Sequence, residues 1–354
     1  MNKIAPANDE RSFKRTVGVD IGGANLKYVS YEDTEALASN FPMWRQADQL
    51  SDAMVKDVQQ FGHVDSLAVT MTGELADCFV DRQQGVEHIV DHVLAMAQRL
   101  SISHVCFYGV DGKFHDAAWA VANADVIAAA NWHALANYIG QTIRSDALLI
   151  DIGSTTTDLI PISAGQVATE AQTDHDRLVE GSLVYVGRRR TPVCGLVDHL
   201  AFRGTEATVM NEFFATIDDA LIVLGRTEPL ENDCDSADGK PRTIAFAANR
   251  LARMIGLDRR TVSEQDAQDL ATQVVDAANK RIVDGITRLG LDIGTMDIVL
   301  SGHGPNLLNK NAFDLPGKPS RTMMEDIIGE AVCRAAPAFA VAALLAAQTQ
   351  QNST

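Results

Sequence analysis

The chain has 354 residues, of which 46% are hydrophobic and 22% are charged, a composition typical of a folded globular protein rather than a disordered one. That length exceeds what one hydrophobic core usually supports, so two lobes are expected. The formal net charge of −17 disfavours nucleic acids and anionic membrane surfaces as partners. An anionic small-molecule ligand would need local compensation by backbone amides, a few basic side chains or a metal ion.

The cysteine pattern and the two chain ends favour a cytoplasmic protein. The five cysteines are scattered without a C-x-x-C pair, which suits free thiols in a reducing compartment. Residues 1–15 are polar and lack the apolar region of a signal peptide, and residues 1–13 read as a frayed tail. The most apolar stretch, 331–347, contains Arg334 and Pro337 and is short for a bilayer span. It predicts a buried alanine-rich helix and no membrane anchor.

Strand and helix patterns alternate along the chain, as in α/β proteins. In the first half they predict strands at 16–21, 26–29 and 66–70, and helices at 47–61, 86–100 and 117–139. In the second half they predict strands at 147–152 and 296–301, helices at 205–225, 243–256 and 264–289, a turn-rich loop at 228–242, and a closing helical region at 320–348. The predicted domains are residues 14–146 and 147–354.

Two segments of the chain resemble each other. Residues 17–23 read VGVDIGG and residues 148–154 read LLIDIGS, so each apolar strand ends in Asp-Ile-Gly and enters a turn of small residues. A unit repeated once at about half-chain distance predicts a pseudo-symmetric pair of domains. A third Asp-Ile-Gly, at 292–294, precedes its strand and is not expected to match the other two.

Both glycine turns suit a phosphate group, because glycine lets backbone N–H groups approach phosphate oxygens closely. One such turn is usually only a hairpin, but two copies at the start of two lobes favour phosphate binding. The predicted phosphate-binding residues are Gly22, Gly23, Asn25 and Lys27 on the first turn, and Gly153, Ser154, Thr155, Thr156 and Thr157 on the second.

Two aspartates at the strand ends predict a metal site. Asp20 and Asp151 occupy equivalent positions in the repeat and would face each other across a cleft. A pair of carboxylates suits hydrated Mg²⁺, which keeps several waters and takes one or two protein ligands. Both aspartates are therefore predicted as catalytic residues and as metal ligands.

These motifs resemble a known superfamily. The paired turns, and residues 298–304 (IVLSGHG), are similar to the phosphate and adenosine turns of sugar kinases, heat-shock ATPases and actin. Residues 69–75 (VTMTGEL), 149–161, 190–193 (RTPV) and 250–256 (RLARMIG) look like the hydantoinase/oxoprolinase-related branch, and within it the proteins linked to tetrahydromethanopterin-dependent C1 transfer. The resemblance covers most of residues 15–305. It implies a two-lobed actin-like (ribonuclease H-like) α/β fold with a ligand cleft between the lobes.

The resemblance also implies a synthase of methanofuran biosynthesis. That type of enzyme joins a furfuryl diphosphate to the phenol of a glutamylated tyramine and releases diphosphate. The two turns would hold the diphosphate and Mg²⁺ would neutralise charge on the leaving group. The phenol, with a reference pKa of about 10, would need a base, and Glu74 is the candidate. Alternatively, Glu74 caps a helix that begins at Leu75.

Further residues have both a substrate-binding and a structural interpretation. Asp174 fits the Thr-Asp-x-x-Arg-Leu pattern of the subfamily, but a surface ion pair with Arg177 would look the same. The run 188–190 could bind a diphosphate or the glutamyl carboxylate of the substrate, or form a solvated turn, and among its three arginines only Arg190 is favoured as a substrate ligand. Gly302 and Gly304 are predicted to contact substrate. His88 and His92 read as an exposed helix face rather than a zinc site, Trp119 and Trp132 as core residues, and Cys194 as buried and inert.

Other functions compete with the synthase. An ATP-dependent small-molecule kinase would use the same turns, although His303 and Pro305 make residues 301–305 a poor adenosine site. A filament-forming or chaperone-like relative and a hydantoinase-like hydrolase are further alternatives. The sequence therefore predicts a small-molecule phosphate or diphosphate partner, with ATP as cofactor and assembly as a homodimer left open.

Overall fold

The computed structural model describes residues 15–292, 294–309 and 321–351, so the predicted frayed tail at 1–13 lies outside the described residues. Internal contacts divide the chain into two compact units, Met1–Leu135 with Pro337–Thr354, and Ala136–Ala336. The closing helix thus belongs with the first unit. The predicted domain boundary at 146–147 and the predicted cleft stay predictions, and each unit is described by itself.

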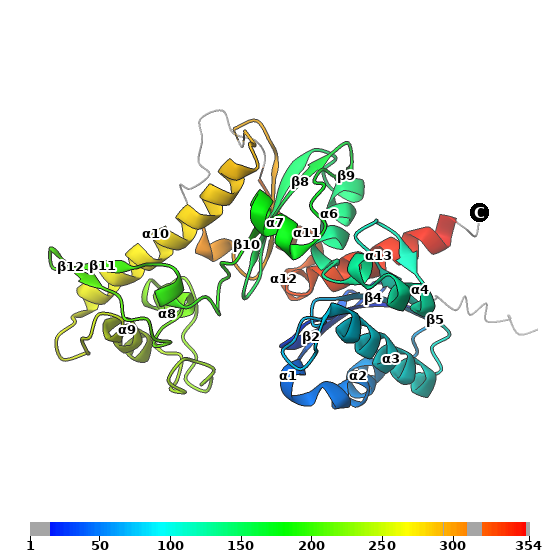
Figure 1. Cartoon of the computed structure of the whole chain (residues 1–354), viewed down its shortest axis with the longest axis horizontal. Coiled ribbons are helices and arrows are strands. Elements are labelled where there is room, and N and C mark those ends of the chain that lie inside the picture. Colours follow the sequence, from blue (N-terminus) through cyan, green and yellow to red (C-terminus); the bar gives the residue numbers. More distant parts are fainter. Residues whose placement is uncertain (1–14, 293, 310–320, 352–354) are drawn as a thin grey trace, which may run out of the picture. The chain divides into compact units, whose positions relative to one another are not determined.

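The first unit is built on a six-stranded sheet of order β3-β2-β1-β4-β5-β6 (Figure 1). β1 is antiparallel to β2 and parallel to β4, which in turn is parallel to β5. The strands are β1 Thr16–Ile21, β2 Asn25–Ser30, β3 Glu35–Asn40, β4 Ser66–Met71, β5 His104–Tyr108 and β6 Phe114–His115. The helices are α1 Met43–Gln46, η1 Ala47–Gln49, α2 Leu50–Val58, η2 Gln59–Phe61, α3 Arg82–Leu100, α4 Ala117–Ala122, α5 Ala124–Ile127 and α6 Asn131–Thr142, which crosses the unit boundary.

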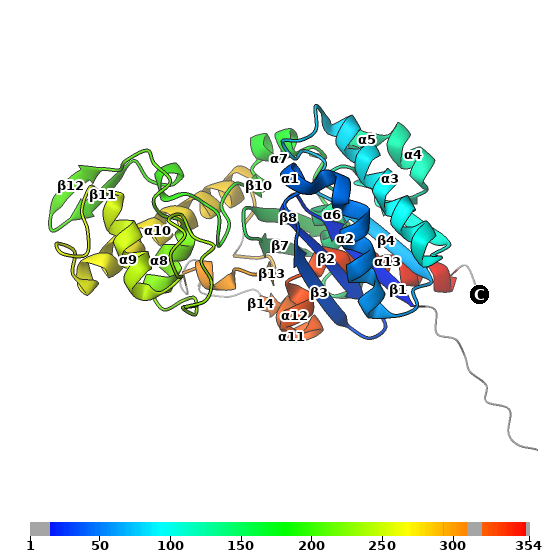
Figure 2. The same ribbon diagram turned by 90° about the horizontal axis from the view of Figure 1, so that it is seen from below.

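The buried strands and the helices over them form the core of this unit. Every residue of β1 and of β4 is buried, as expected for parallel strands that are covered on both faces. α2 and α3 lie side by side over the sheet in Figure 2. α3 begins where the Asp81 carboxylate accepts the N–H of Gln84 at 2.9 Å, and it ends at Ser101 in the left-handed conformation.

The closing helix α13, Ala336–Gln351, packs directly on β1. A Cβ atom at Gly18 would overlap the carbonyl oxygen of Ala338, so only glycine permits this contact. The rings of Tyr31 and Phe339 lie 6.0 Å apart on the same side of the unit. The predicted alanine-rich helix is therefore confirmed as buried, although a short α12, Glu330–Cys333, precedes it as a separate helix.

The sheet of the second unit repeats the pattern of the first. Its order is β10-β8-β7-β13-β14, with β9 paired to β8. β7 is antiparallel to β8 and parallel to β13, as β1 is to β2 and β4. The strands are β7 Ala147–Ile152, β8 Thr157–Ser163, β9 Gln166–Val167, β10 Leu183–Val184, β13 Ile298–Gly302 and β14 Arg321–Met323. This order and these directions are those of the ribonuclease H-like fold, so the predicted α/β class and the internal repeat are confirmed.

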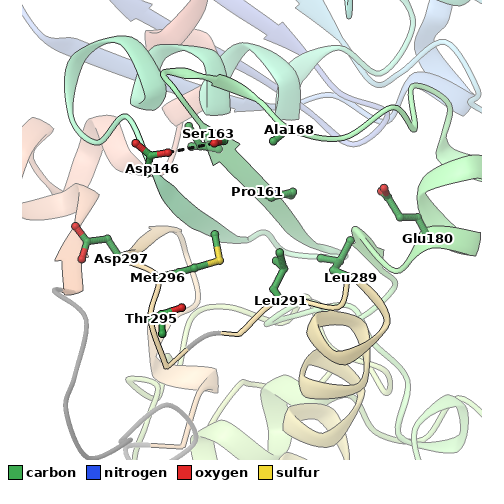
Figure 3. Close-up of a pocket in the computed structure, with 11 residues that line it drawn as sticks. Asp146, Pro161, Ser163, Ala168, Glu180, Leu289, Leu291, Thr295, Met296 and Asp297 are labelled. Carbon is green, nitrogen blue, oxygen red and sulfur yellow. Dashed lines mark hydrogen bonds between the residues drawn. The ribbon is translucent and has the colours of Figure 1, made fainter.

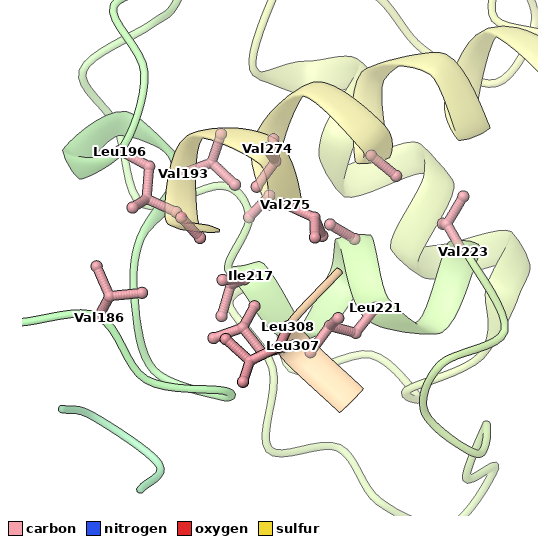
Figure 4. Close-up of a cluster of buried hydrophobic side chains, with 14 of the residues drawn as sticks. Val186, Val193, Leu196, Ile217, Leu221, Val223, Val274, Val275, Leu307 and Leu308 are labelled. Carbon is pink, nitrogen blue, oxygen red and sulfur yellow. The ribbon is translucent and has the colours of Figure 1, made fainter. Parts of the chain in front are cut away.

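Helices and one hairpin complete the second unit. They are α7 Asp174–Glu180, η3 Val193–Gly195, β11 His199–Phe202, β12 Thr205–Thr208, α8 Ile217–Val223, α9 Ile244–Arg253, α10 Glu264–Arg288, η4 Pro305–Leu307, α11 Met324–Ile328 and α12. Figure 4 shows Val274 and Val275 of α10 in one apolar cluster with Ile217 and Leu221 of α8. None of the helices in the described part of the chain has the length and apolarity needed to cross a membrane.

Three predicted helices differ from the structure. The predicted helix at 205–225 is wrong over its first half, because Arg203 and Gly204 both adopt positive φ and close a two-residue hairpin between β11 and β12. The predicted helix at 117–139 is interrupted, with Ala129 at φ 49°, and becomes α4, α5 and α6. The closing region at 320–348 opens with strand β14 rather than a helix.

Gly18 provides a test of the packing of α13 on β1. Gly18→Ala should lower the free energy of unfolding by about 1–3 kcal/mol, because an added methyl group overpacks a tight backbone contact. The measurement is chemical denaturation followed by circular dichroism. Gly23→Ala is the control, since no atom lies within 4 Å of the added Cβ, and it should change stability by less than about 0.5 kcal/mol. Equal stability of the two variants would contradict the packing.

Candidate active site

The first glycine turn joins β1 to β2 in the first unit. Gly22 donates its N–H to the carbonyl of Asn25 at 3.0 Å, and the carbonyl of Gly23 accepts from the N–H of Met43 at 2.9 Å. Asp20 is buried one residue before the turn, directly opposite Lys27 in the strand register. Cross-strand partners lie on the same face of a sheet, so the structure brings Asp20 and Lys27 together as neighbours.

The loop after β4 lies against this turn. Thr72 and Gly73 both donate their N–H groups to the carbonyl of Ile21 at 2.9 Å. Glu74 follows and is only 1% exposed, and α3 approaches its backbone so closely that Gly85 has no room for a Cβ atom. α3 begins at Arg82 with Asp81 as its cap, so the alternative in which Glu74 caps a helix starting at Leu75 is wrong. The structure thus places a buried carboxylate beside the first turn.

The second glycine turn joins β7 to β8, with Asp151 half-buried just before it. The N–H of Gly153 donates to the carbonyl of Thr156 at 2.8 Å. The N–H groups of residues 154–156 have no hydrogen-bond partner among the described residues. The buried hydroxyl of Thr157 donates to the carbonyl of Val186 at 2.6 Å and so links β8 to the segment that follows β10, and its predicted phosphate contact stays a prediction.

An arginine-rich segment, residues 187–191, docks on this turn through its backbone. The N–H of Arg188 donates to Gly153 at 3.0 Å, and those of Arg189 and Arg190 donate to Ser154 at 3.0 and 2.9 Å. A Cβ atom at Gly187 would overlap the backbone of Thr155. The carbonyl groups of Gly153 and Ser154 are thereby occupied, whereas the amides of residues 154–156 have no hydrogen-bond partner among the described residues. Such a turn presents hydrogen-bond donors to an anion.

The side chains of the three arginines diverge. Arg189 pairs with Asp233 at 3.0 Å and Asp235 at 3.1 Å. Arg190, which the sequence favoured, is exposed. Arg188 is half-buried and donates to the hydroxyl of Thr227 at 3.1 Å. The position in the sequence pointed to the last of the three, and only the fold shows that Arg188 and Arg189 turn inward.

A third glycine segment lies beside the end of β7. Ser301 and Gly302 pair with Asp151 and Ile152, and His303 donates its N–H to the carbonyl of Ile152 at 2.9 Å. Gly302 has φ 85°, and a Cβ atom there would lie 2.6 Å from Oδ1 of Asp151. A Cβ atom at Gly304 would overlap the side chain of Ile152. Both glycines are thus required by packing, and their predicted contact with substrate stays a prediction.

Asp174 lies in the first turn of α7, where it faces a buried arginine. Arg177 is 2% exposed and pairs with Asp158 of β8 at 2.5 Å and with Asp174 at 3.9 Å. The same guanidinium donates to the carbonyl of Ser182 at 3.2 Å. The pattern therefore has a structural explanation inside the fold, although the ion pair is more buried than the surface pair that the sequence suggested. A role of Asp174 in substrate binding stays a prediction.

Metal ligands were predicted at Asp20 and Asp151, which the structure places at equivalent strand ends of the two units. Their carboxylate oxygens are the ligand type that Mg²⁺ prefers. Among the described residues, no cluster of three or more His, Cys, Asp or Glu side chains could hold a metal by itself. Nε2 of His88 donates to the carbonyl of Ala47 at 3.1 Å, and Nδ1 of His92 accepts from the N–H of Ser51 at 3.1 Å. The two histidines join α3 to the preceding helices and do not form the exposed face that the sequence suggested.

Trp119, Trp132 and Cys194 were predicted to be buried, and only Trp132 is fully buried. Trp132 is buried, whereas Trp119 is half-buried and its ring stacks on that of His115 at 3.5 Å. Cys194 is half-buried and packs against the apolar cluster of the second unit. None of the three contacts a glycine turn through a described interaction.

A pocket in the second unit lies at the opposite end of the strands from the glycine turn. It has a volume of about 600 Å³, and its wall includes Asp146, just before β7, and Asp297, just before β13 (Figure 3). The carboxylate of Asp146 accepts a hydrogen bond there from the hydroxyl of Ser163 at 3.1 Å. Because ligands of α/β sheets bind beyond the carboxyl ends of the strands, this pocket is a poor candidate for the site.

Residues 65–350 match the hydantoinase/oxoprolinase family. The chain belongs to this family. It is 34% identical over 334 residues to a protein of Methanocaldococcus jannaschii called (4-{4-[2-(gamma-L-glutamylamino)ethyl]phenoxymethyl}furan-2-yl)methanamine synthase, with 94% of this chain and 98% of that protein covered. A protein of Methanococcus vannielii with the same name is 30% identical over 212 residues, which cover 59% of this chain and 95% of that protein.

Among solved structures, the chain is similar to the activator of the 2-hydroxyisocaproyl-CoA dehydratase from Clostridium difficile with bound ADPNP. The identity is 11% and the TM-score is 0.42, with 95% of this chain and 97% of that chain covered. A likeness of this degree indicates neither ligand nor activity. The family membership and the homologues thus confirm the hydantoinase/oxoprolinase resemblance drawn from the sequence motifs.

A substitution at Gly153 can test ligand binding by the second turn without a large effect on stability. A Cβ atom there would meet only the carbonyl oxygen of Thr156, at an ordinary contact distance of 3.4 Å. Gly153→Val should therefore weaken binding of inorganic diphosphate at least tenfold, because its side chain would block access to the turn amides. Its melting temperature should stay within about 3 °C of the unmodified protein, which corresponds to about 1 kcal/mol.

The matched variant is Gly302→Val, which should instead lose stability because of its positive φ and its contact with Ile152. Titration calorimetry and thermal melts on both proteins provide the comparison. Unchanged diphosphate affinity in a folded Gly153→Val protein would exclude this turn as a phosphate site.

Proposed function

We propose that the protein is a synthase of methanofuran biosynthesis that joins a furfuryl diphosphate to the phenol of a glutamyl-tyramine. The observation that carries the proposal is the 34% identity to the named Methanocaldococcus jannaschii synthase over 94% of this chain. The name of that relative describes a product in which a phenoxymethyl ether links a glutamylaminoethyl-phenol to a furan methanamine. The amides of residues 154–156, which have no hydrogen-bond partner among the described residues, support a phosphate-bearing leaving group on the furan partner.

The bond changes follow from that product. The CH₂–O bond of the furfuryl diphosphate breaks, and its electron pair leaves with the diphosphate oxygen. The phenol oxygen forms the new CH₂–O bond and gives up its proton. Because the furan ring delocalises positive charge at the CH₂ carbon, stabilising the departing diphosphate lowers the barrier. The turn amides and nearby basic side chains would provide that stabilisation.

The proton of the phenol needs an acceptor. Glu74 is a buried carboxylate beside the first glycine turn, and a carboxylate held in a fixed position by α3 suits a general base. Mg²⁺, when bound by Asp20 and Asp151, would supply positive charge against the diphosphate.

The reaction itself is the direct test. The purified protein would be incubated with aminomethylfuran-methyl diphosphate, glutamyl-tyramine and Mg²⁺, with the ether product followed by mass spectrometry and diphosphate by a coupled assay. Equal amounts of ether and diphosphate are expected. Hydrolysis of ATP that depends on a small alcohol or acid, with no ether formed, would establish the kinase alternative instead.

The paired aspartates give a second prediction. Asp20→Asn and Asp151→Asn should each lower kcat at least a hundredfold while the circular dichroism spectrum is unchanged, because a neutral amide is a poor ligand for Mg²⁺. Turnover should be measured over a Mg²⁺ titration. Near-normal turnover in either variant would rule out a metal shared by the two carboxylates.

Glu74→Gln tests the base. Loss of a general base typically costs 10²- to 10⁴-fold, so kcat should fall by about that factor with little change in the affinity for diphosphate. Glu87→Gln on the exposed face of α3 is the matched control, with the same chemical change away from the turns. Equal kcat in the two variants would remove Glu74 from the chemistry.

A further inference from the structure

The guanidinium of Arg188 is half-buried and forms no ion pair with a carboxylate in the part of the chain that the structure describes. Its side chain is half-buried, and its described hydrogen bond is to the neutral hydroxyl of Thr227 at 3.1 Å. No Asp or Glu oxygen among the described residues lies within ion-pair distance of it. Buried or partly buried arginines usually have an anionic partner, so this charge is unusual within the structure.

The neighbouring charges do not supply the missing partner. Asp218 is the acidic group that acts on Arg188, but both its oxygens already accept from Arg242, at 2.7 and 2.8 Å. Arg189 is paired to Asp233 and Asp235. The other groups that act on Arg188 are cations, namely Arg242, Arg334 and Arg189. Arg188 therefore lies in a locally positive region of a protein whose formal net charge is −17.

The position of Arg188 relates this charge to the second glycine turn. Its N–H donates to the carbonyl of Gly153 at 3.0 Å, and its Cβ atom is 3.4 Å from the Cβ position of Gly304. The residue is thus fixed between two glycine segments at the end of β7. The Arg188 side chain therefore starts next to the turn that carries the amides of residues 154–156, and its guanidinium extends to the hydroxyl of Thr227.

We propose that Arg188, together with the amides of the 154–156 turn, forms an anion subsite that binds one phosphate group of a diphosphate. The proposal rests on the proposed function, which it refines by naming the side chain that holds the leaving group. A planar guanidinium binds phosphate oxygens through two parallel N–H donors, and this geometry favours arginine over lysine. Arg190, the residue that the sequence favoured, is not required by this subsite.

The electrostatic state of Arg188 agrees with this assignment. Burial lowers the pKa of its guanidinium, Asp218 opposes that effect, and Arg242, Arg334 and Arg189 lower the pKa further. Holding this cation in a partly buried position therefore destabilises the folded state, and a bound anion would offset that destabilisation. Binding of diphosphate should accordingly stabilise the folded state more than binding to the turn amides alone.

Binding of inorganic diphosphate, measured by titration calorimetry with Mg²⁺ present, tests the subsite. Arg188→Gln should raise the Kd at least tenfold, and Arg188→Lys should raise it about threefold, because charge is kept but the paired donors are lost. Arg259→Gln is the control, since it removes an exposed arginine from the same unit, and its Kd should be within twofold of the unmodified protein. Circular dichroism and thermal melts confirm that each variant is folded.

The outcomes separate this proposal from the proposed function. If the unmodified protein binds diphosphate and Arg188→Gln binds it equally well, the subsite assignment is wrong while the phosphate site stands. If Arg190→Gln alone weakens binding, the anion is held by the exposed arginine and the proposal is overturned. If the unmodified protein does not bind diphosphate, both the subsite and the diphosphate chemistry fail. Should Arg188→Gln not fold, Arg188→Lys decides, and an unchanged Kd in that folded variant overturns the role of the paired donors.

Discussion

Close backbone packing at the end of β7 is the constraint on which the second unit depends. Gly187, Gly302 and Gly304 each stand where a Cβ atom would overlap a neighbouring segment. The result is that the carbonyls of residues 152–154 and 156 all accept hydrogen bonds from within the fold. A phosphate group is repelled by carbonyl oxygens and attracted by amides, so this hydrogen-bond pattern is the one that the proposed diphosphate site requires.

The features of the fold and of the candidate site that could be predicted from the sequence are those that depend on residues close together in the chain. The two strand–turn–strand units were predictable because their Asp-Ile-Gly patterns are local, and the α/β class followed from them. The hairpin at 199–208 was missed because positive φ at Arg203 is not encoded by any strong residue preference. The role proposed for Arg188 was missed because Asp233, which pairs with Arg189, lies 44 residues away in the sequence. No local pattern shows which of the three arginines forms an ion pair and which does not.

A set of buried ion pairs connects the glycine turn to the helical part of the second unit. Arg242 pairs with Asp218, and Arg250, which is fully buried, pairs with Asp219. Burial raises the pKa of Asp219, and the Arg250 guanidinium opposes that rise. Removing one member would leave an uncompensated charge, which is far more costly than replacing the whole pair. The loop at 228–242 is therefore held by charge rather than by apolar packing, and Arg189 joins it to the turn.

The return of α13 to the first unit has a consequence for how the protein is made. β1 is synthesised long before its neighbour Ala338, although the two segments pack in direct contact at Gly18. The second unit, which is continuous in sequence, has all its strands available sooner. Burial of β1 at Gly18 therefore cannot be completed until Ala338 of α13 has been synthesised.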